Sequence, residues 1–353
     1  MEMFKYNSIE QYRHFVKSAI RAQQYTHTDE EGHAQYDKSV VLSKVDIFGT
    51  VKIHGTNAAI TYDGTKRVLQ FQSRNNIIDL ESDNCGFVAH MDPHRSTLIH
   101  YCKAIMAKVP DCNSVRIYGE WCGGNIQAGV GVNGLPKMFV IFDVYTKHGD
   151  DWVKMDIFQP LLRLVPLPEV NIYIIYTFGL YLATVDLANP ESATAELARY
   201  TNEVELDCPV AKIIKRDLGI TDLPNTVGEG IVWTDATKQN CFKVKGDKHS
   251  ASKVKKLVTV DPQIVECMNE FVEYACTDIR LNQGYKELFG EWKEPPEMTE
   301  IGFFIKWVMT DIAKEESDVL VNSGMTMKQV TSRLLNEIKK FYHSKLGSIG
   351  TAW

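Results

Sequence analysis

The chain has 353 residues and a mass of 40.1 kDa, more than a single hydrophobic core usually serves, so we expect two domains. Hydrophobic residues make up 44% and charged residues 24%, a balance that excludes a globally disordered or collagen-like protein. The net charge of −6 argues against a protein that binds nucleic acid through a uniformly basic surface.

The sequence also bears on location. It contains no run of about 18 uncharged apolar residues, the length that crosses a bilayer, and its first residues lack an apolar signal core. None of its eight cysteines lies at the two-residue spacing of a zinc knuckle. We therefore expect a cytoplasmic protein, in the host cytoplasm if it is viral, with reduced thiols and no membrane partner.

The chain begins with a helical pattern from Ile9 to Ile20, followed by a polar stretch from Thr26 to Lys38 that predicts an exposed loop. Further on, short β-branched and aromatic runs bounded by turn residues predict strands. These runs are Val40 to Ile47, Ala58 to Tyr62, Val68 to Gln72, Val115 to Glu120, Met138 to Tyr145, Ile172 to Phe178, Gly230 to Trp233 and Cys241 to Val244. Helical patterns lie between them at Ser96 to Lys108 and Ser192 to Val204. This irregular alternation predicts an α+β domain built on antiparallel sheets over residues 1–258.

Beyond Asp261-Pro262 the pattern changes, because every apolar periodicity there is helical. One helix face is formed by Ile301, Phe304, Ile305, Val308 and Ile312, and another by Val330, Leu334, Leu335, Ile338 and Phe341. Residues 263–353 are therefore predicted to form a small all-helical C-terminal domain.

Lys52 occupies a position suited to chemistry. It follows an apolar run and precedes His54-Gly55-Thr56, which predicts a strand that ends in a tight turn. An amine attacks phosphorus only when it is neutral, whereas a free lysine titrates near ~10.4, so such a site must favour the neutral form by desolvation or nearby cations. Lys243 and Lys245 are available cations, and residues two apart on a strand face the same side.

Several such features occur in one order, and in that order the sequence resembles the phage RNA ligase 2 family. This family is a branch of the covalent nucleotidyltransferases, which also include DNA ligases and capping enzymes. The run Lys52-Ile53-His54-Gly55-Thr56-Asn57 is identical to the family's nucleophile motif. The resemblance implies that Lys52 carries the adenylate and that His54 and Asn57 line the nucleotide site.

The resemblance extends to three groups that would bind the nucleotide. Arg74 in Ser73-Arg74-Asn75 corresponds to the arginine that contacts the ribose or the RNA end. Glu120 in Tyr118-Gly119-Glu120-Trp121 corresponds to the glutamate that holds the ribose hydroxyls, and Phe142 to the aromatic side chain that stacks on adenine.

The remaining correspondences concern the phosphates. Glu229 in Gly228-Glu229-Gly230-Ile231-Val232 matches the carboxylate that assists the attack by the lysine and is a candidate ligand of the metal. Asp143, next to Phe142, is a second candidate metal ligand. Lys243 and Lys245 match the paired lysines that grip the α-phosphate. Val51 departs from the family pattern. At this position, directly before the lysine, one family member has an acidic residue, and that acid contacts the edge of the adenine.

The resemblance implies an ATP-grasp-like nucleotidyltransferase domain with antiparallel sheets and flanking helices over residues 1–258, followed by the helical domain of residues 263–353. It implies an ATP-dependent RNA ligase that uses Mg²⁺, with Mn²⁺ able to substitute. The expected partner is RNA, with a nicked duplex favoured, and the expected state is a monomer. Between residues 238 and 256, seven lysines accompany one acid, and such a strip suits phosphates.

Two other functions stay open. A capping-type guanylyltransferase would share the lysine, but the resemblance would then predict a β-barrel after Lys245, where the pattern is helical. A non-catalytic RNA-binding protein on a ligase scaffold would lack motif residues.

Two further patterns receive structural interpretations. Gly129 to Gly134 fits a dinucleotide-binding string but lacks the following helix, so we expect a turn-rich loop. His90 and His94 have metal-ligand spacing only within a helix, which Pro93 disfavours, so a surface loop is expected there.

Overall fold

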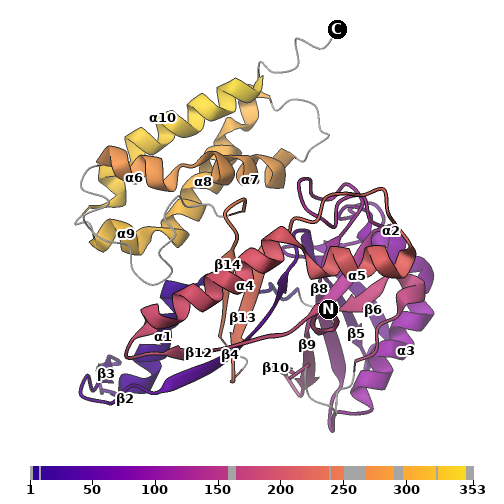
Figure 1. Cartoon of the computed structure of the whole chain (residues 1–353). Coiled ribbons are helices and arrows are strands. Elements are labelled where there is room, and N and C mark those ends of the chain that lie inside the picture. Colours follow the sequence, from indigo (N-terminus) through magenta and orange to yellow (C-terminus); the bar gives the residue numbers. More distant parts are fainter. Residues whose placement is uncertain are drawn as a thin grey trace. The chain divides into compact units, whose positions relative to one another are not determined.

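The computed structural model describes residues 3–7, 9–157, 164–237, 240–249, 268–289, 297–322 and 325–346 (Figure 1). Contacts between residues divide the chain into two compact units. The first unit comprises Met1–Glu10 and Lys17–Gly246, and the second comprises Gln11–Val16 and Asp247–Trp353. The predicted domain boundary between residues 258 and 263 lies outside the described residues, so it stays a prediction.

A five-stranded sheet carries the C-terminal strands of the first unit. Its strands lie in the order β1 (Glu10–Gln11), β14 (Cys241–Lys245), β13 (Gly230–Asp235), β4 (Lys44–Lys52) and β12 (Tyr181–Asp186). Helix α4 (Thr194–Leu206) packs against β12, β13 and β14. The sheet therefore has one face covered by a helix and one face turned away from it.

The second sheet of this unit has seven strands. Six lie in the order β10 (Asp151–Lys154), β9 (Met138–His148), β8 (Ser114–Cys122), β5 (Thr56–Asp63), β6 (Val68–Ser73) and β7 (Ile77–Ile78). The seventh, β11 (Ile172–Ile174), pairs in parallel with β9, so the expectation of purely antiparallel sheets is wrong for this strand. Helix α3 (Arg95–Met106), reached through α2 (Phe87–Met91) and the 3₁₀ helix η1 (Asp92–His94), packs against β8.

Alternation along β4 decides which side chains face the helix-covered side of the first sheet. Ile47, Gly49 and Val51 are buried, while the residues between them are partly exposed. Trp233, the partner of Gly49 on β13, has its ring centroid 6.1 Å from that of Tyr200 on α4. Because side chains alternate along a strand, Lys52 lies on the opposite face.

Several predicted elements differ from the structure. The stretch predicted as a loop from Thr26 to Lys38 forms most of a hairpin of β2 (Tyr25–Thr28) and β3 (Ala34–Tyr36). Every residue of these two strands is exposed, so no apolar alternation marked them. The Asp29 carboxylate closes the turn by accepting hydrogen bonds from the backbone N–H groups of Glu31 and His33.

Other differences concern element ends. The first long strand begins at Lys44 rather than Val40, and the predicted strand from Ile172 to Phe178 continues past β11 as a 3₁₀ helix, η3 (Ile175–Phe178). The elements that were not predicted include β12 and helix α5 (Pro209–Leu218). His90 lies in α2 and not in a loop, with its Nε2 atom 3.1 Å from the carbonyl oxygen of Val170. Residues 129–134 form turns, as predicted.

The described residues of the second unit from Met268 onward are helical or lie in short connections. Its helices are α6 (Met268–Ala275), α7 (Asp278–Phe289), the 3₁₀ helix η6 (Met298–Glu300), α8 (Ile301–Glu315), α9 (Ser317–Asn322) and α10 (Met327–Leu346). Their core includes Phe304, Val308, Ile312, Val330, Leu334 and Ile338, which belong to the two predicted helix faces. None of the helices in the described part of the chain is long and apolar enough to span a membrane.

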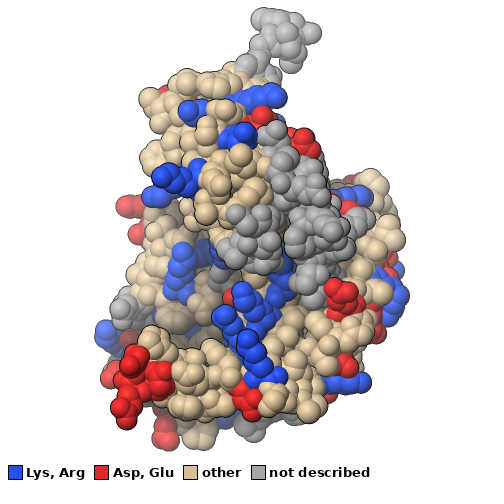
Figure 2. Space-filling view, turned by 90° about the vertical axis from the view of Figure 1, so that its left-hand side faces the viewer, with Lys and Arg blue, Asp and Glu red and all other residues tan. Residues whose placement is uncertain are grey.

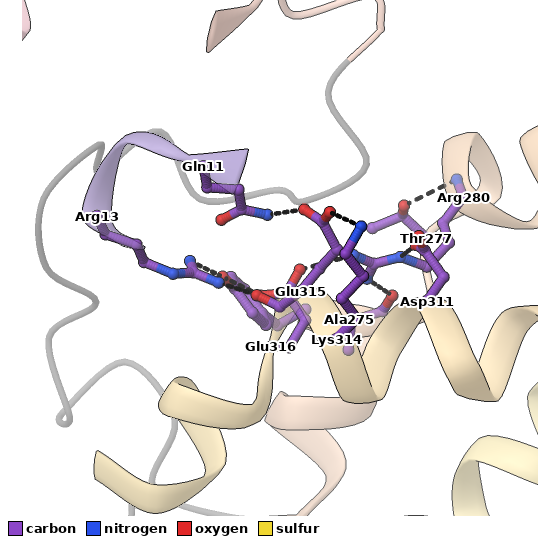
Figure 3. Close-up of polar contacts among 10 residues, drawn as sticks. Gln11, Arg13, Ala275, Thr277, Arg280, Asp311, Lys314, Glu315 and Glu316 are labelled. Carbon is purple, nitrogen blue, oxygen red and sulfur yellow. Dashed lines mark hydrogen bonds and ion pairs between the residues drawn. The ribbon is translucent and has the colours of Figure 1, made fainter. Parts of the chain in front are cut away.

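A buried network of charges lies within the second unit, and Figure 3 shows most of it. Arg280 and Glu316, both 0% exposed, form an ion pair of 2.6 Å, and the Arg280 Nε atom lies 2.8 Å from Asp311. Arg13, from the first turn of α1 (Tyr12–Gln24), donates to the second oxygen of Glu316 at 3.1 Å, and Tyr274 donates to the same oxygen at 2.9 Å. The N-terminal segment thus completes the hydrogen bonding of Glu316.

We expect Arg13→Met to destabilise the second unit by ~2–3 kcal/mol, because it leaves a buried carboxylate with one charge-assisted hydrogen bond fewer. Arg21→Met, at the exposed end of the same helix, is the matched control and should change stability by less than ~0.5 kcal/mol. Hydrogen exchange resolved by region measures the effect. Arg13→Met should lower the protection of backbone amides in α7 and α8. Loss of protection confined to the β-sheets would contradict this assignment.

Candidate active site

Lys52 lies where the chain passes from one sheet to the other. It is the last residue of β4 in the five-stranded sheet, and Thr56 begins β5 in the seven-stranded sheet. The connection is tight at Gly55, where a Cβ atom would collide with the backbone oxygen of Trp121. Glycine is therefore required at this turn, which fixes the backbone beside the lysine.

The Lys52 ammonium pairs with the carboxylate of Glu229. Lys52 Nζ lies 2.7 Å from Glu229 Oε2, and Lys245 Nζ lies 3.0 Å from the other oxygen, Oε1. His54 Nδ1 lies 3.2 Å from Oε2. The Glu229 side chain is 1% exposed, against 18% for Lys52 and 15% for Lys245, so two partly accessible cations share one buried anion.

Strand register explains this convergence. Gly230, the residue after Glu229, pairs with Lys52 on one side and with Lys245 on the other. Gly230 has φ 147°, and a Cβ atom there would collide with the backbone oxygen of Val244. The absence of a side chain between the two lysines lets the sheet close tightly at this row.

The charge of Glu229 is stabilised by its neighbours. Burial by itself would raise the pKa of this carboxyl group, but Lys52, Lys245 and His54 hold the pKa well below its ordinary value. The group therefore stays ionised at every pH at which the protein is ordinarily handled.

Lys243 lies two residues before Lys245 on β14. It pairs with Val232, which in turn pairs with Thr50 on β4, and the alternation of β14 places it on the same face as Lys245. The sheet thus brings the predicted lysine pair to the face and end that carry Lys52.

Glu120 lies on the neighbouring sheet, next to the lysine turn. Its Oε1 atom accepts a hydrogen bond of 3.0 Å from the backbone N–H of Gly55, and Glu120 pairs across the strands with Asn57. The Asn57 Oδ1 atom is buried and has no hydrogen-bond partner among the described residues. A buried acceptor left in this way is a candidate contact for a ligand, since an unsatisfied acceptor costs free energy. Arg74, in the exposed turn after β6, lies close enough to lower the pKa of Glu120.

Burial raises the pKa of Glu120 to about 7, although Lys52 acts in the opposite direction. Between the ordinary value of 4.5 and about 7, the folded protein holds a proton that the unfolded chain has released, so folding stability falls as pH rises through this window. We expect Glu120→Gln to remove ~1–3 kcal/mol of this dependence, at 1.36 kcal/mol per pKa unit.

Urea unfolding of wild type and Glu120→Gln at pH 5 and pH 8 measures this effect. The unfolding free energy of the variant should change less between the two pH values, with Glu196→Gln on the exposed side of α4 as the control. Identical pH dependence in wild type and Glu120→Gln would contradict the raised pKa.

Phe142 and Asp143 occupy a β-bulge on β9. The register shifts so that Tyr118 faces Asp143 and Gly119 faces Ile141, which leaves Phe142 without an opposite residue. Bulges redirect side chains and are common beside active sites. The Asp143 carboxylate is 7% exposed and already has two partners, Lys154 Nζ at 2.8 Å and the Tyr6 hydroxyl at 2.5 Å.

The predicted metal ligands stay predictions. Both Glu229 and Asp143 are engaged by cations, and no group of three His, Cys, Asp or Glu side chains among the described residues could hold a metal ion. A metal in this site would take most of its ligands from water and phosphate oxygens, as Mg²⁺ commonly does.

Sequence reasoning assigned no role to Tyr6 or Lys154, although both contact Asp143. Tyr6 lies before the first helical pattern, outside every motif that the sequence analysis singled out. Lys154 ends a short strand, β10, whose four residues carry no distinguishing pattern.

The site as a whole combines a lysine amine, a second lysine on the same carboxylate, and a separate carboxylate, an amide and an aromatic ring on the neighbouring sheet. Such a set suits the transfer of a nucleotide through its phosphate to an amine, because cations neutralise phosphate oxygens while the other groups bind sugar and base.

Comparison with solved structures finds Naegleria gruberi RNA ligase. A variant solved with ATP and Mn has 13% identity and a TM-score of 0.42, with 70% of this chain and 58% of that chain covered. The same enzyme with PPi has 14% identity and a TM-score of 0.41, with 69% and 56% covered. This chain thus spans less than two thirds of the length of those chains.

Among curated protein sequences, none matches this chain significantly. The sequence model of the RNA ligase family matches residues 45–255, a segment that includes more than half of the chain and extends from strand β4 past strand β14. Lys52, Glu120, Glu229 and both lysines of β14 lie within it. This chain therefore belongs to the RNA ligase family.

Proposed function

We propose that this chain is an ATP-dependent RNA ligase that joins RNA 3′-hydroxyl and 5′-phosphate ends through a lysyl-AMP on Lys52. The observation that carries the proposal is the pairing of Lys52 and Lys245 on the two oxygens of buried Glu229, within the segment that matches the RNA ligase family. We further propose that residues 1–258 form an ATP-grasp-like nucleotidyltransferase domain and residues 263–353 a helical domain. Limited proteolysis tests this, since cleavage should begin between residues 258 and 263, before either domain is cut.

The first step is attack of the Lys52 amine on the ATP α-phosphorus. The Lys52 ammonium first releases one proton to water. A bond then forms between Nζ and phosphorus, the bond to the bridging oxygen breaks, pyrophosphate leaves, and a second proton passes from the nitrogen to water. Lys52 starts this step in an ion pair, so arrival of the nucleotide must draw the amine away from Glu229. Lys245 and Lys243 would neutralise the α-phosphate oxygens as charge builds up on them.

The remaining groups would bind the nucleoside. Glu120 can accept hydrogen bonds from the ribose hydroxyls, and Asn57 Oδ1 is a second acceptor beside it. Stacking of adenine on Phe142 would contribute ~1–3 kcal/mol. Val51 is 2% exposed and faces the covered side of its sheet, so base selection would depend on other groups.

The donor set fits a divalent cation bound mainly through phosphate. Glu229 is the carboxylate that would hold Mg²⁺ or Mn²⁺ once the nucleotide engages Lys52 and Lys245. When bound, such an ion neutralises phosphate charge and orients the leaving group.

After the lysyl-AMP has formed, AMP passes to an RNA 5′-phosphate, and a 3′-hydroxyl then displaces AMP to seal the strand. We propose that a nicked duplex is the preferred substrate. In Figure 2, lysine and arginine side chains gather at the centre of the first unit, in the lower part of the view, and the acidic side chains of that unit lie mainly toward its edges. This distribution lets a chain with a net charge of −6 offer basic surface to phosphates.

Self-adenylation and sealing test the proposal together. The protein is incubated with α-labelled ATP and Mg²⁺, and the label should become covalently bound to the chain through a bond that alkali leaves intact and acid hydrolyses, and it should transfer to 5′-phosphorylated RNA. Sealing is then compared on matched nicked and single-stranded RNA. An unlabelled protein would refute the proposal, whereas faster sealing of the open strand would overturn only the preference for nicks.

The two alternative functions give different results in the same assay. A capping-type guanylyltransferase would take its label from GTP in place of ATP. A non-catalytic RNA-binding protein would retain RNA on a filter but would take label from neither nucleotide.

The exposed side of α10 is the surface of the second unit best suited to phosphates. Five of its exposed side chains are basic, Lys328, Arg333, Lys339, Lys340 and His343, and Glu337 is its exposed acid. Lys339 and Lys340 are successive and both exposed, so reversing both charges changes the charge of the exposed side of the helix over about 100°.

We expect Lys339→Glu combined with Lys340→Glu to weaken sealing about tenfold or more and to flatten its salt dependence, while self-adenylation stays within about twofold. Lys286→Glu combined with Glu287→Lys, on the surface of α7, is the charge-neutral control. Equal loss of both activities would indicate a packing role for α10 instead.

A further inference from the structure

Tyr6 lies against Phe142, although the two residues are 136 positions apart in the sequence. Their ring centroids are 5.2 Å apart with an interplanar angle of 60°, so the rings meet edge to face. The Tyr6 ring also lies 4.9 Å from that of Tyr118 on β8. Phe142 is the bulge residue without a cross-strand partner, so Tyr6 supplies a lateral contact that the sheet does not.

The Tyr6 hydroxyl binds the second residue of the bulge, Asp143. It donates to Asp143 Oδ2 at 2.5 Å, and Lys154 Nζ lies 2.8 Å from that oxygen. Burial and the charge of Asp143 raise the pKa of Tyr6 well above its ordinary value, so the hydroxyl remains a donor. Tyr6 therefore touches both residues of the bulge, one through its ring and one through its hydroxyl.

The backbone before Tyr6 is also held. The carbonyl oxygen of Phe4 accepts hydrogen bonds from Gln72 Nε2 at 2.9 Å and from the Tyr118 hydroxyl at 2.6 Å. The Phe4 ring lies 5.4 Å from the guanidinium carbon of Arg116. With its backbone anchored two residues earlier, Tyr6 has few ways to withdraw from Phe142.

We propose that Tyr6 is a positioning residue that holds the Phe142 ring in the orientation that stacks on the nucleotide base. The inference deepens the proposed function and rests on it. A ring on a bulge has no fixed neighbour across the strands, and a base binds it best when its orientation is set beforehand. Tyr6 acts through Phe142 and has no role in the chemical step.

Single-turnover self-adenylation at varied ATP concentration tests this role. Tyr6→Leu removes the ring and the hydroxyl, and we expect the apparent KM for ATP to rise about fivefold to twentyfold while the maximal rate stays within about twofold. Tyr6→Phe keeps the ring contact, so its KM should rise only about twofold to threefold. Tyr25→Phe, in the exposed hairpin of β2 and β3, is the control, because it removes a tyrosine hydroxyl that pairs with Thr28 and touches neither Phe142 nor the Phe4 carbonyl, and its KM should not change.

A double-mutant cycle with Phe142→Leu separates positioning from general packing. If Tyr6 acts through Phe142, adding Tyr6→Leu to Phe142→Leu should raise KM no further. Full additivity, or a lower labelled fraction at unchanged KM, would overturn the inference. Should Tyr6→Leu fail to fold, the cycle is run with Tyr6→Phe.

Labelling of the wild type separates failure of the proposed function from failure of the role proposed for Tyr6. A wild type that takes no label from ATP overturns the proposed function and the inference with it. A labelled wild type whose Tyr6 variants keep the wild-type KM overturns the inference alone.

Discussion

Replacing Lys52 by arginine is expected to abolish the labelled protein adduct, with a loss of at least about 10⁴-fold in self-adenylation. Arginine keeps a positive charge beside Glu229, so the fold and the ion pair should survive. The guanidinium, however, stays protonated at all accessible pH values and cannot attack phosphorus. Loss of the adduct would therefore report the missing nucleophile and not a missing cation.

The control for this variant is Lys44→Arg, at the exposed opposite end of the same strand, which should label like the wild type. A second measurement supplies RNA that already carries a 5′-adenylate. Lys52→Arg should still seal this RNA at a measurable rate, because displacement of AMP by the 3′-hydroxyl does not use the lysine amine. Normal labelling of Lys52→Arg would move the nucleophile to another residue.

Replacing Glu229 by glutamine should have the second largest effect, because it leaves two lysines without their shared anion. We expect a loss of ~3–4 kcal/mol in the free energy of unfolding at pH 7 and of about 10²-fold or more in self-adenylation. An amide oxygen can accept hydrogen bonds from Lys52 and Lys245, but it carries no charge to balance theirs.

The stability difference between wild type and Glu229→Gln should depend on pH. The pKa of Glu229 lies below its unfolded value of 4.5, so its contribution to stability is present above that value and is lost as pH falls below it. The stability difference between wild type and Glu229→Gln, measured by urea unfolding, should therefore shrink from pH 7 to pH 3. Glu203→Gln, which removes the exposed partner of Arg199, should cost less than ~1 kcal/mol at both pH values. A difference that grew on acidification would contradict the ion-pair explanation.

The strands that carry the candidate site could be predicted because they have clear patterns, whereas the roles of their residues were implied by the family resemblance and stay predictions. Lys52, Glu229 and Lys245 stand at strand ends beside glycines, and the apolar alternation of β4, β13 and β14 fixes which face each one occupies. The two strongest helices of the second unit were predicted for the same reason, since α8 and α10 have continuous apolar faces.

Contacts between distant segments could not be predicted from periodicity. The pairing of Lys52 with Lys245 on one carboxylate depends on strand order, in which β13 lies between β4 and β14 although it comes late in the chain. The bulge at Phe142 leaves an ordinary strand pattern, so nothing in the sequence marks the register shift. The hairpin of β2 and β3 was not predicted, because all residues of its strands are exposed and show no apolar alternation.

The assignment of Gln11–Val16 to the second unit bears on how the chain matures during synthesis. Arg13 and Glu316 are 303 residues apart, and at roughly 5–20 residues per second a ribosome needs on the order of 15–60 s to add the second after the first. Throughout that interval the buried arginine has no carboxylate partner from the late helices. Translation speed between residues 13 and 316 should thus govern how long the first helix waits for its final packing, and how long chaperones have access to it.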